Sequence, residues 1–356
     1  MSRIAAVRGV VAPHGYPQRV ITDAFARVVS PEGKHRATIE RIHAATGVDH
    51  RYLALPLEQY ATLTGFQESN DAFIRVGLDL AEEAVRGALQ DAGLLPEDVD
   101  VIVSTSVTGV AAPSIDAALA QRVGLRPDVK RIPVFGLGCV AGASGLARVH
   151  DLLRGDPTGV AVLLSVELCS LTVQRDDVSM ANVVASGLFG DGAAAVVIVG
   201  DDRATATGGP EIVASRSRLY PDSQRVMGWD IGEHGFRIVL SASVPDLVTT
   251  YLGDDVTSLL ADHDLEVGDV TGWVCHPGGP KVLTAMQDAL GLHTGQLDVT
   301  WRSLGAVGNL SSSSVLHVLA DTLSSDPAAR PPGSPGVLLA MGPGFCSELV
   351  LVRASA

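Results

Sequence analysis

One cysteine lies where a short strand is expected to turn into a helix. Residues 132–135 predict a short buried strand, and the apolar spacing over 146–153 predicts a helix that begins near Val140. The glycine-rich turn between them places Cys139 at the helix N-terminus. Unpaired backbone N–H groups there favour a thiolate, so the pattern predicts a nucleophilic thiol with a lowered pKa. A buried structural cysteine is the alternative, and this stretch alone does not decide between the two.

An imidazole and a carboxamide stand at similar junctions later in the chain. His276 follows an apolar strand at 272–275 and precedes a Pro-Gly-Gly-Pro turn, and Asn309 precedes a helix of small residues. A Cys/His/Asn set without an acidic partner suits acyl transfer through a thioester. The imidazole and amide N–H groups can together donate to a developing oxyanion or enolate. A thioester hydrolase would need an acid to activate water, and we interpret the nearest candidates, Glu167 and Asp191, as residues that fix loops.

An internal repeat predicts how these residues meet. Residues 91–100 and 262–271 each combine a helix end, an acidic turn and the start of a buried strand. We therefore divide the chain into an N-terminal half, 1–210, with the cysteine, and a C-terminal half, 211–356, with the histidine and asparagine. Apolar strands without polar alternation imply sheets covered on both faces. The expected architecture is α/β in five layers, with the helices after the cysteine and the asparagine in the centre.

The composition narrows the class of protein. The chain has 356 residues, of which 46% are hydrophobic, enough for one large α/β domain or two subdomains. No apolar run reaches the roughly 18 residues of a membrane span, and the first residues lack a signal-peptide core, so we expect a cytoplasmic protein. The widely spaced cysteines favour reduced thiols over disulfides or zinc. A net charge of −14 without a basic stripe argues against nucleic-acid binding.

Five short motifs occur in a fixed order along nearly the whole chain. Each is weak evidence alone, but the ordered set resembles the type III polyketide synthases, the chalcone synthase superfamily. The related β-ketoacyl-carrier-protein synthase III has His-Gln-Ala-Asn where this chain has His-Pro-Gly-Gly, so we rank that interpretation below. The motifs are Gly138-Cys139-x-x-Gly142, Gly187-Leu188-Phe189-Gly190-Asp191-Gly192, His276-Pro277-Gly278-Gly279-Pro280, Gly308-Asn309-Leu310-Ser311-Ser312 and Gly342-Pro343-Gly344.

The resemblance implies a fold, a reaction and roles for residues. It implies a homodimer of thiolase-like αβαβα subunits that condense malonyl-CoA with a starter acyl-CoA, repeatedly and with loss of CO₂. Cys139 would carry the growing chain, while His276 and Asn309 would bind the thioester carbonyl and drive decarboxylation. Phe189 would form a gate between the CoA tunnel and the cavity. The substrates are CoA thioesters, no cofactor is implied, and most members of this family need no carrier protein.

The residues expected to bind the CoA phosphates differ from those of the plant members. Thr38 and Ala45 stand at two of the three basic positions that hold CoA phosphates there, which leaves Arg41. Arg36 and Arg51 lie close in sequence to this position. These arginines either help to anchor phosphates or are ordinary solvated side chains.

Further departures concern the cavity and therefore the product. Ile238 stands at a second aromatic gate of the plant enzymes, Ala112 at a methionine of their dimer interface and Trp229 at a wall glycine. Trp229 should partly fill the cavity and exclude a bulky aromatic starter, whereas Ile238 and Ala112 both remove side-chain volume and should open a narrow apolar route. Such a route favours a fatty acyl-CoA starter and an alkylpyrone or alkylresorcinol product. The alternative is a malonyl-CoA-primed synthase that makes tetrahydroxynaphthalene or dihydroxyphenylacetate. The cavity-wall positions by this resemblance are Thr108, Cys169, Thr172, Trp229 and Ser311.

Overall fold

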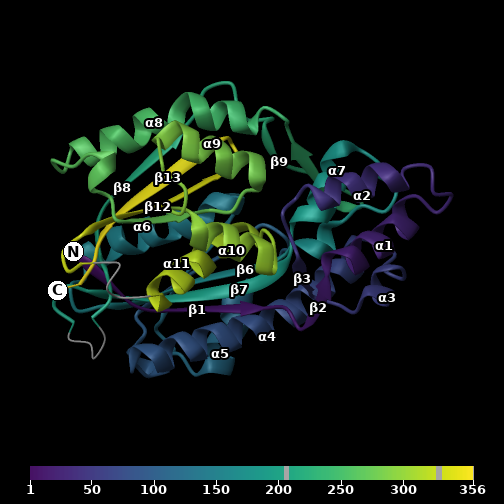
Figure 1. Ribbon diagram of the computed structural model, residues 1–356. Coiled ribbons are helices and arrows are strands. Elements are labelled where there is room, and N and C mark those ends of the chain that lie inside the picture. Colours follow the sequence, from purple (N-terminus) through teal and green to yellow (C-terminus); the bar gives the residue numbers. More distant parts are fainter. Residues whose placement is uncertain (204–207, 326–330, 356) are drawn as a thin grey trace.

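A mixed sheet of nine strands runs through the molecule in the order β11-β12-β13-β8-β1-β7-β6-β4-β5 (Figure 1). The computed structural model describes residues 1–203, 208–325 and 331–355 of the chain, and the strand count refers to these. The strands of the sheet are β1 (Ser2–Val11), β4 (Val101–Ser106), β5 (Lys130–Phe135), β6 (Val160–Leu168), β7 (Asp191–Gly200), β8 (Glu211–Leu219), β11 (Gly272–Cys275), β12 (Pro335–Gly342) and β13 (Cys346–Arg353).

The two parts of this sheet share one strand order. In the N-terminal part β4 pairs parallel with β6, which is antiparallel to β7, which is antiparallel to β1. In the C-terminal part β11, β12, β13 and β8 repeat this pattern of one parallel and two antiparallel pairings. Two residue pairs, Ser2 with Ile212 and Arg3 with Glu211, join β1 to β8. The chain boundary between 210 and 211 stays a prediction.

Two helices lie between the two parts of the sheet. They are α6 (Ala141–Arg154), after the cysteine, and α11 (Ser314–Ser324), after the asparagine. Their apolar residues share one buried core with strands from both halves. Gly142 allows close contact here, because a Cβ atom on it would lie 2.3 Å from the Ser312 carbonyl oxygen and 2.6 Å from a methyl of Val315. The predicted central layer is therefore present.

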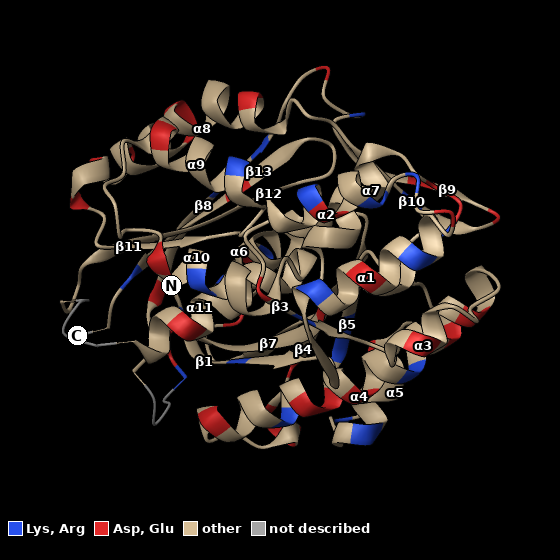
Figure 2. Ribbon diagram, turned by 45° about the vertical axis from the view of Figure 1, so that its right-hand side comes forward, with Lys and Arg blue, Asp and Glu red and all other residues tan. Residues whose placement is uncertain are grey.

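Helices cover the outer face of each part of the sheet. The helices α4 (Phe66–Ala92) and α5 (Ile115–Val123) pack on the N-terminal part, and α8 (Val244–Ala261) and α9 (Pro280–Leu290) pack on the C-terminal part. Figure 2 shows Asp and Glu along the outer helices α4 and α8, away from the central layer. The order is thus helices, sheet, central helices, sheet, helices, which confirms the five-layered α/β expectation.

The repeated acidic turn has the same structure in both halves. Pro96–Asp98 and Val267–Asp269 each form one 3₁₀ turn. The Asp98 carboxylate accepts the Leu95 N–H at 2.8 Å, and the Asp269 carboxylate accepts the Glu266 N–H at 2.8 Å. Each turn therefore uses its last aspartate as a cap.

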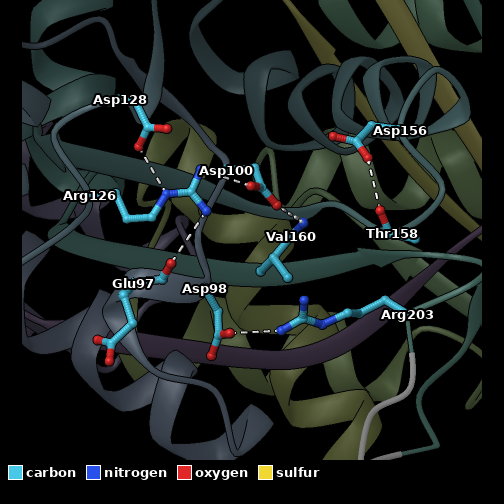
Figure 3. A network of polar contacts seen from close by, with 9 residues as sticks. All are labelled: Glu97, Asp98, Asp100, Arg126, Asp128, Asp156, Thr158, Val160 and Arg203. Carbon is cyan, nitrogen blue, oxygen red and sulfur yellow. Dashed lines mark hydrogen bonds and ion pairs between the residues drawn. The ribbon is translucent and has the colours of Figure 1, made fainter.

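An ion-pair network surrounds the first of these turns (Figure 3). Arg203 pairs with Asp98 at 2.8 Å, and Arg126 bridges Asp100 and Asp128. Asp100 also accepts the Val160 N–H at 2.8 Å. The network ties the turn before β4 to the first residue of β6.

Most of the remaining elements gather at one end of the sheet, whereas α10 lies beside α11 (Figure 1). Two small two-stranded sheets lie among them, β2 with β3 and β9 with β10. Their bounds are β2 (His14–Pro17), α1 (Gln18–Val29), α2 (Arg36–Ala44), β3 (His50–Leu53), α3 (Leu57–Tyr60), α7 (Met180–Leu188), β9 (Met227–Gly232), β10 (Gly235–Leu240) and α10 (Asp298–Val307).

The strand before the cysteine differs from the prediction. We expected it to be buried, but β5 is the edge strand of the sheet, and Ile132 and Phe135 are 36% and 49% exposed. The helix after it also starts slightly later, because residues 138–140 form a 3₁₀ turn before α6. Among the described helices, none combines the length and apolar character that a membrane crossing needs.

Candidate active site

Cys139 sits in the 3₁₀ turn that leads into α6, and it is 7% exposed. Gly138 precedes it with a φ of 54°, and a Cβ atom there would lie 2.8 Å from the ring of Pro343. Only glycine fits this turn without strain. Cys139 Sγ donates to Ser311 Oγ at 3.8 Å, so the thiol meets the segment after Asn309. The structure thereby joins the cysteine turn of one half to the asparagine turn of the other.

His276 and Asn309 lie next to each other at the same junction. His276 follows β11, and its backbone N–H donates to the Leu339 carbonyl of β12 at 2.9 Å. Asn309 Oδ1 accepts the Ser311 N–H at 2.8 Å, which orients the carboxamide so that Nδ2 lies 3.4 Å from His276 Nε2. Both residues are buried, at 3% and 2% exposed. Two such nitrogen atoms can donate to one oxygen atom placed between them.

Burial favours the neutral forms of the thiol and the imidazole. It raises the pKa of Cys139 to about 12, although hydrogen bonds to Ser311 and Asn309 act in the opposite direction. It lowers the pKa of His276 to about 3. The lowered thiol pKa expected from the helix N-terminus is therefore wrong for this structure, because desolvation outweighs the helix end. His276 Nδ1 is buried and has no hydrogen-bond partner among the residues that the structure describes.

Glu167 and Asp191 hold the loops around the cysteine. Glu167 accepts the Thr108 hydroxyl at 2.8 Å and the Val107 N–H at 3.1 Å on one oxygen, and the Ser311 hydroxyl at 3.3 Å on the other. Asp191 accepts N–H groups from Ala54 at 2.6 Å and Ser170 at 2.8 Å. Both carboxylates are buried, and their contacts fit the loop-fixing interpretation.

A cavity of about 560 Å³ opens beside Cys139. Its wall comes from α1, α3, the segment 169–177, the start of the cysteine turn and the β9/β10 hairpin. His276 and Asn309 are not among the residues that line this cavity, whereas Ser311, two residues after Asn309, is. The structure brings the following sequence-predicted residues together on it: Cys139, Thr108, Cys169, Thr172, Phe189, Trp229, Ile238 and Ser311.

Phe189 connects this cavity to the asparagine turn. It follows α7 and forms an isolated bridge with Asn309, in which the Gly190 N–H donates to the Asn309 carbonyl at 2.9 Å. Across the β9/β10 hairpin Trp229 lies directly opposite Ile238. Trp229 also contacts Phe236, with ring centroids 5.9 Å apart. Trp229 and Ile238, the two hairpin residues at which the sequence differs from the plant enzymes, are thus cross-strand neighbours on one wall of the cavity.

Three other positions lie away from the cavity wall. Arg41, the expected CoA-binding residue, is exposed on α2, and Thr38 is half-buried on the same helix. Ala112 is exposed in the loop between β4 and α5. Their parts in CoA binding and dimer contact remain predictions.

Two arginines of the cavity wall were not expected there: the sequence left Arg51 as either a phosphate anchor or a solvated side chain, and it gave Arg175 no role. Arg51 is 2% exposed and lines the cavity, so it is not a solvated arginine, and Arg175 lines it as well. Arg36, in contrast, is an exposed side chain paired with Asp23 and Glu40. In β3 Arg51 stands between His50 and Tyr52, so neither its neighbours nor those of Arg175 gave a signal for a buried cavity residue.

The fold and the site define a condensing enzyme that transfers acyl groups. Two family models match the chain: the N-terminal domain of chalcone and stilbene synthases over residues 2–203 and their C-terminal domain over 211–356. The chain therefore belongs to the chalcone and stilbene synthase family and is a type III polyketide synthase.

Individual relatives agree with this assignment. The chain is 56% identical over 352 residues to a 1,3,6,8-tetrahydroxynaphthalene synthase of Streptomyces peucetius subsp. caesius, covering 98% of this chain and 92% of the relative. It is 36% identical to a putative chalcone synthase of Bacillus subtilis, with 85% of each chain covered. The crystal structure of the tetrahydroxynaphthalene synthase of Streptomyces coelicolor superposes with a TM-score of 0.93 at 26% identity, covering 99% of both chains.

Proposed function

We propose that this enzyme primes itself with malonyl-CoA, extends the chain with further malonyl-CoA and cyclises it to a tetrahydroxynaphthalene. The similarity to the Streptomyces peucetius 1,3,6,8-tetrahydroxynaphthalene synthase, 56% identity over 98% of this chain, carries the assignment of the product, and the malonyl-CoA starter follows from the malonyl-primed alternative of the sequence analysis. The cavity supports it, because Trp229 occupies wall space that a long alkyl starter would need. This evidence favours the malonyl-primed alternative over the fatty acyl starter favoured by the sequence analysis.

Loading begins with the thiol of Cys139 and a CoA thioester. The sulfur attacks the thioester carbonyl while its proton passes to a base, a role that we assign to His276 as a neutral imidazole. The oxyanion forms between His276 Nε2 and Asn309 Nδ2, which lie 3.4 Å apart. Collapse of this intermediate expels the CoA thiolate, which takes up the proton, and leaves the acyl group on the cysteine.

Condensation uses the same two donors. The bond between the α-carbon and the carboxylate of malonyl-CoA breaks, CO₂ leaves, and the electron pair forms an enolate whose oxygen accepts hydrogen bonds from His276 and Asn309. The enolate carbon attacks the acyl group on Cys139, and the cysteine leaves as thiolate. The elongated chain then returns from CoA to Cys139. A homodimer, as the resemblance implies, is part of this proposal.

Incubation with malonyl-CoA alone, and with acyl-CoAs of graded chain length, tests the starter. Mass spectrometry should find tetrahydroxynaphthalene or its oxidation product from malonyl-CoA alone, with no gain when an acyl-CoA is added. Alkylpyrones that appear only with acyl-CoAs would overturn the proposal in favour of the fatty acyl starter.

A Trp229→Gly variant tests the wall argument in the same assay. Removing the indole should enlarge the cavity and let longer acyl-CoAs compete with malonyl-CoA as starters. Phe66→Leu, which alters an aromatic contact of Phe236 outside the cavity wall, is the matched control and should keep the wild-type preference. Unchanged starter preference in the Trp229 variant would contradict a wall that limits the starter.

A further inference from the structure

Two guanidinium groups of the cavity wall each retain an unused donor. Arg51 Nη2 and Arg175 Nη2 are buried nitrogen atoms without a hydrogen-bond partner among the described residues. Both side chains line the cavity that contains Cys139. A buried cationic N–H without a partner is costly, so a cavity that keeps two of them is suited to an anionic occupant.

Arg51 is held rigidly in the wall. Its Nε donates to Gln18 at 2.8 Å, and its Nη1 donates to the Phe189 carbonyl at 2.8 Å. Gly308 makes room for it, because a Cβ atom there would lie 3.2 Å from the arginine side chain. The buried carboxylate of Asp191 acts on Arg51 through its charge. The remaining donor, Nη2, is thus fixed in place and free for a ligand.

Arg175 approaches the same wall from the segment after Cys169. Its Nη1 donates to the Ala61 carbonyl at 2.8 Å, directly after α3, and Tyr60 at the end of α3 lies near Arg51. Arg51 and Arg175 therefore both lie near the C-terminal end of α3. Asp176 and Asp177 also line the cavity, but Asp177 already accepts the Ser179 N–H at 2.7 Å.

A malonyl starter differs from an acetyl or alkyl starter in one feature that a guanidinium group can recognise. A malonyl group on Cys139 carries a free carboxylate, whereas an acetyl or alkyl acyl group does not. Guanidinium and carboxylate form short, charge-assisted hydrogen bonds that neutral groups cannot replace. Pairing also stabilises the carboxylate as an anion, which opposes its loss as CO₂. A bound starter would therefore keep its carboxylate during loading, while extender units decarboxylate next to His276 and Asn309. Tetrahydroxynaphthalene has ten carbons, two from each malonyl unit, so the starter carboxylate must also leave as CO₂ at a later step, before the product is released.

We propose that Arg51 and Arg175 bind the carboxylate of a malonyl group loaded on Cys139 and so select malonyl-CoA as the starter. This inference rests on the proposed function. It assigns starter choice to two positioned cations, in addition to the size of the cavity.

The choice of starter can be measured alone if Cys139 is loaded with an acyl group but condensation is prevented. In an Asn309→Ala background, where decarboxylation is suppressed, intact-protein mass spectrometry distinguishes malonyl-Cys139 from acetyl-Cys139. Adding Arg175→Met should raise the malonyl-CoA concentration for half-loading about 10–100-fold, the size of a lost charge-assisted hydrogen bond. Loading by acetyl-CoA should not change. Arg175→Lys should recover part of the malonyl loading, and Arg51→Lys should weaken it in the same direction.

The control is Arg225→Met in the same background. Arg225 is exposed, pairs with Asp230 and lies outside the cavity wall, so this variant should be loaded by both thioesters as readily as the Asn309→Ala background. Equal losses for malonyl-CoA and acetyl-CoA in the Arg175 variant would overturn the proposal, as would no loss for either. If Arg51→Lys fails to fold, the Arg175 pair of variants still decides. Failure of the proposed function is a separate result, because it is the absence of product from wild-type enzyme supplied with malonyl-CoA alone.

Discussion

At the scale of single residues, burial sets the protonation of the thiol and imidazole. With a pKa of about 12 for Cys139 and about 3 for His276, both groups are neutral near pH 7. We therefore expect alkylation of Cys139 by iodoacetamide to rise with pH through pH 9 without a plateau. A raised pKa means that the thiolate fraction increases with pH and is still small at the ordinary cysteine value of about 8.5. Rates at Cys139, followed by peptide mass spectrometry, measure this.

The His276→Ala variant is the control for this titration. If the resting pair is neutral, removing the imidazole should leave the pH dependence of alkylation nearly unchanged. A midpoint below pH 8 in the wild type that rises in His276→Ala would contradict the neutral pair and restore the ion pair expected from the sequence.

Asn309 should matter more for decarboxylation than for loading. Its Nδ2 lies beside His276 Nε2, where the enolate oxygen is expected, so Asn309→Ala removes one of two donors. Loss of one such donor costs about 10²–10³ in rate. Release of CO₂ from malonyl-CoA should fall by this factor, while starter loading on Cys139 should fall less. Equal losses in the two half-reactions would argue against this division of roles.

The sequence predicted which residues form the site, but it did not predict the direction in which the pKa of the thiol shifts. Cys139 and His276 could be found because each follows the end of an apolar strand, and Asn309 because it stands in the second half where the cysteine stands in the first. The direction of the thiol pKa could not, because the depth of burial depends on segments such as 311–313 and 342–344 that are distant in sequence. Arg175 was missed for the same reason, since only the fold brings its segment to α3.

At the scale of elements, the close contact of α6 with the segment before α11 holds the site together. Gly142→Ala places a Cβ atom 2.3 Å from the Ser312 carbonyl oxygen. We expect a loss of about 1–3 kcal/mol in the free energy of unfolding. Activity should fall further than stability explains, because Ser311 and Asn309 move with Ser312. Denaturant unfolding and condensation rates measure the two effects.

Gly268→Ala is the matched control for this substitution. It lies in the outer 3₁₀ turn at 267–269, and a Cβ atom there meets nothing within 4 Å. It should leave stability within about 0.5 kcal/mol of the wild type. A Gly142→Ala variant as stable and active as this control would show that the helix contact is not needed.

Edge strands show where element prediction from sequence ends. Residues 132–135 of β5 are mostly apolar, but the strand begins with Lys130 and Arg131; among the described strands it pairs only with β4, and its outer side is exposed. Local pattern identifies a strand, but its place in the sheet depends on the order of all strands. The repeated turns at 96–98 and 267–269 were predictable because aspartate, spacing and following strand recur together.

At the scale of the whole molecule, the duplicated sheet and the paired central helices explain why one site draws on both halves. The cysteine turn comes from the N-terminal half, and the histidine and asparagine turns come from the C-terminal half. The five layers bring these turns to one junction, with the cavity on the side of α1, α3 and the β9/β10 hairpin. The layered plan followed from the sequence, whereas the shape of the cavity required the hairpin and α3 in place.

Quenching the enzyme during turnover with malonyl-CoA tests the central claim most directly. The peptide that contains Cys139 should carry a ladder of acyl masses that differ by one ketide unit, and the peptide that contains Cys169, which lines the same cavity, should carry none. Product should be tetrahydroxynaphthalene without any added acyl-CoA. Acyl masses on Cys169, or an unmodified Cys139 while product accumulates, would contradict the account.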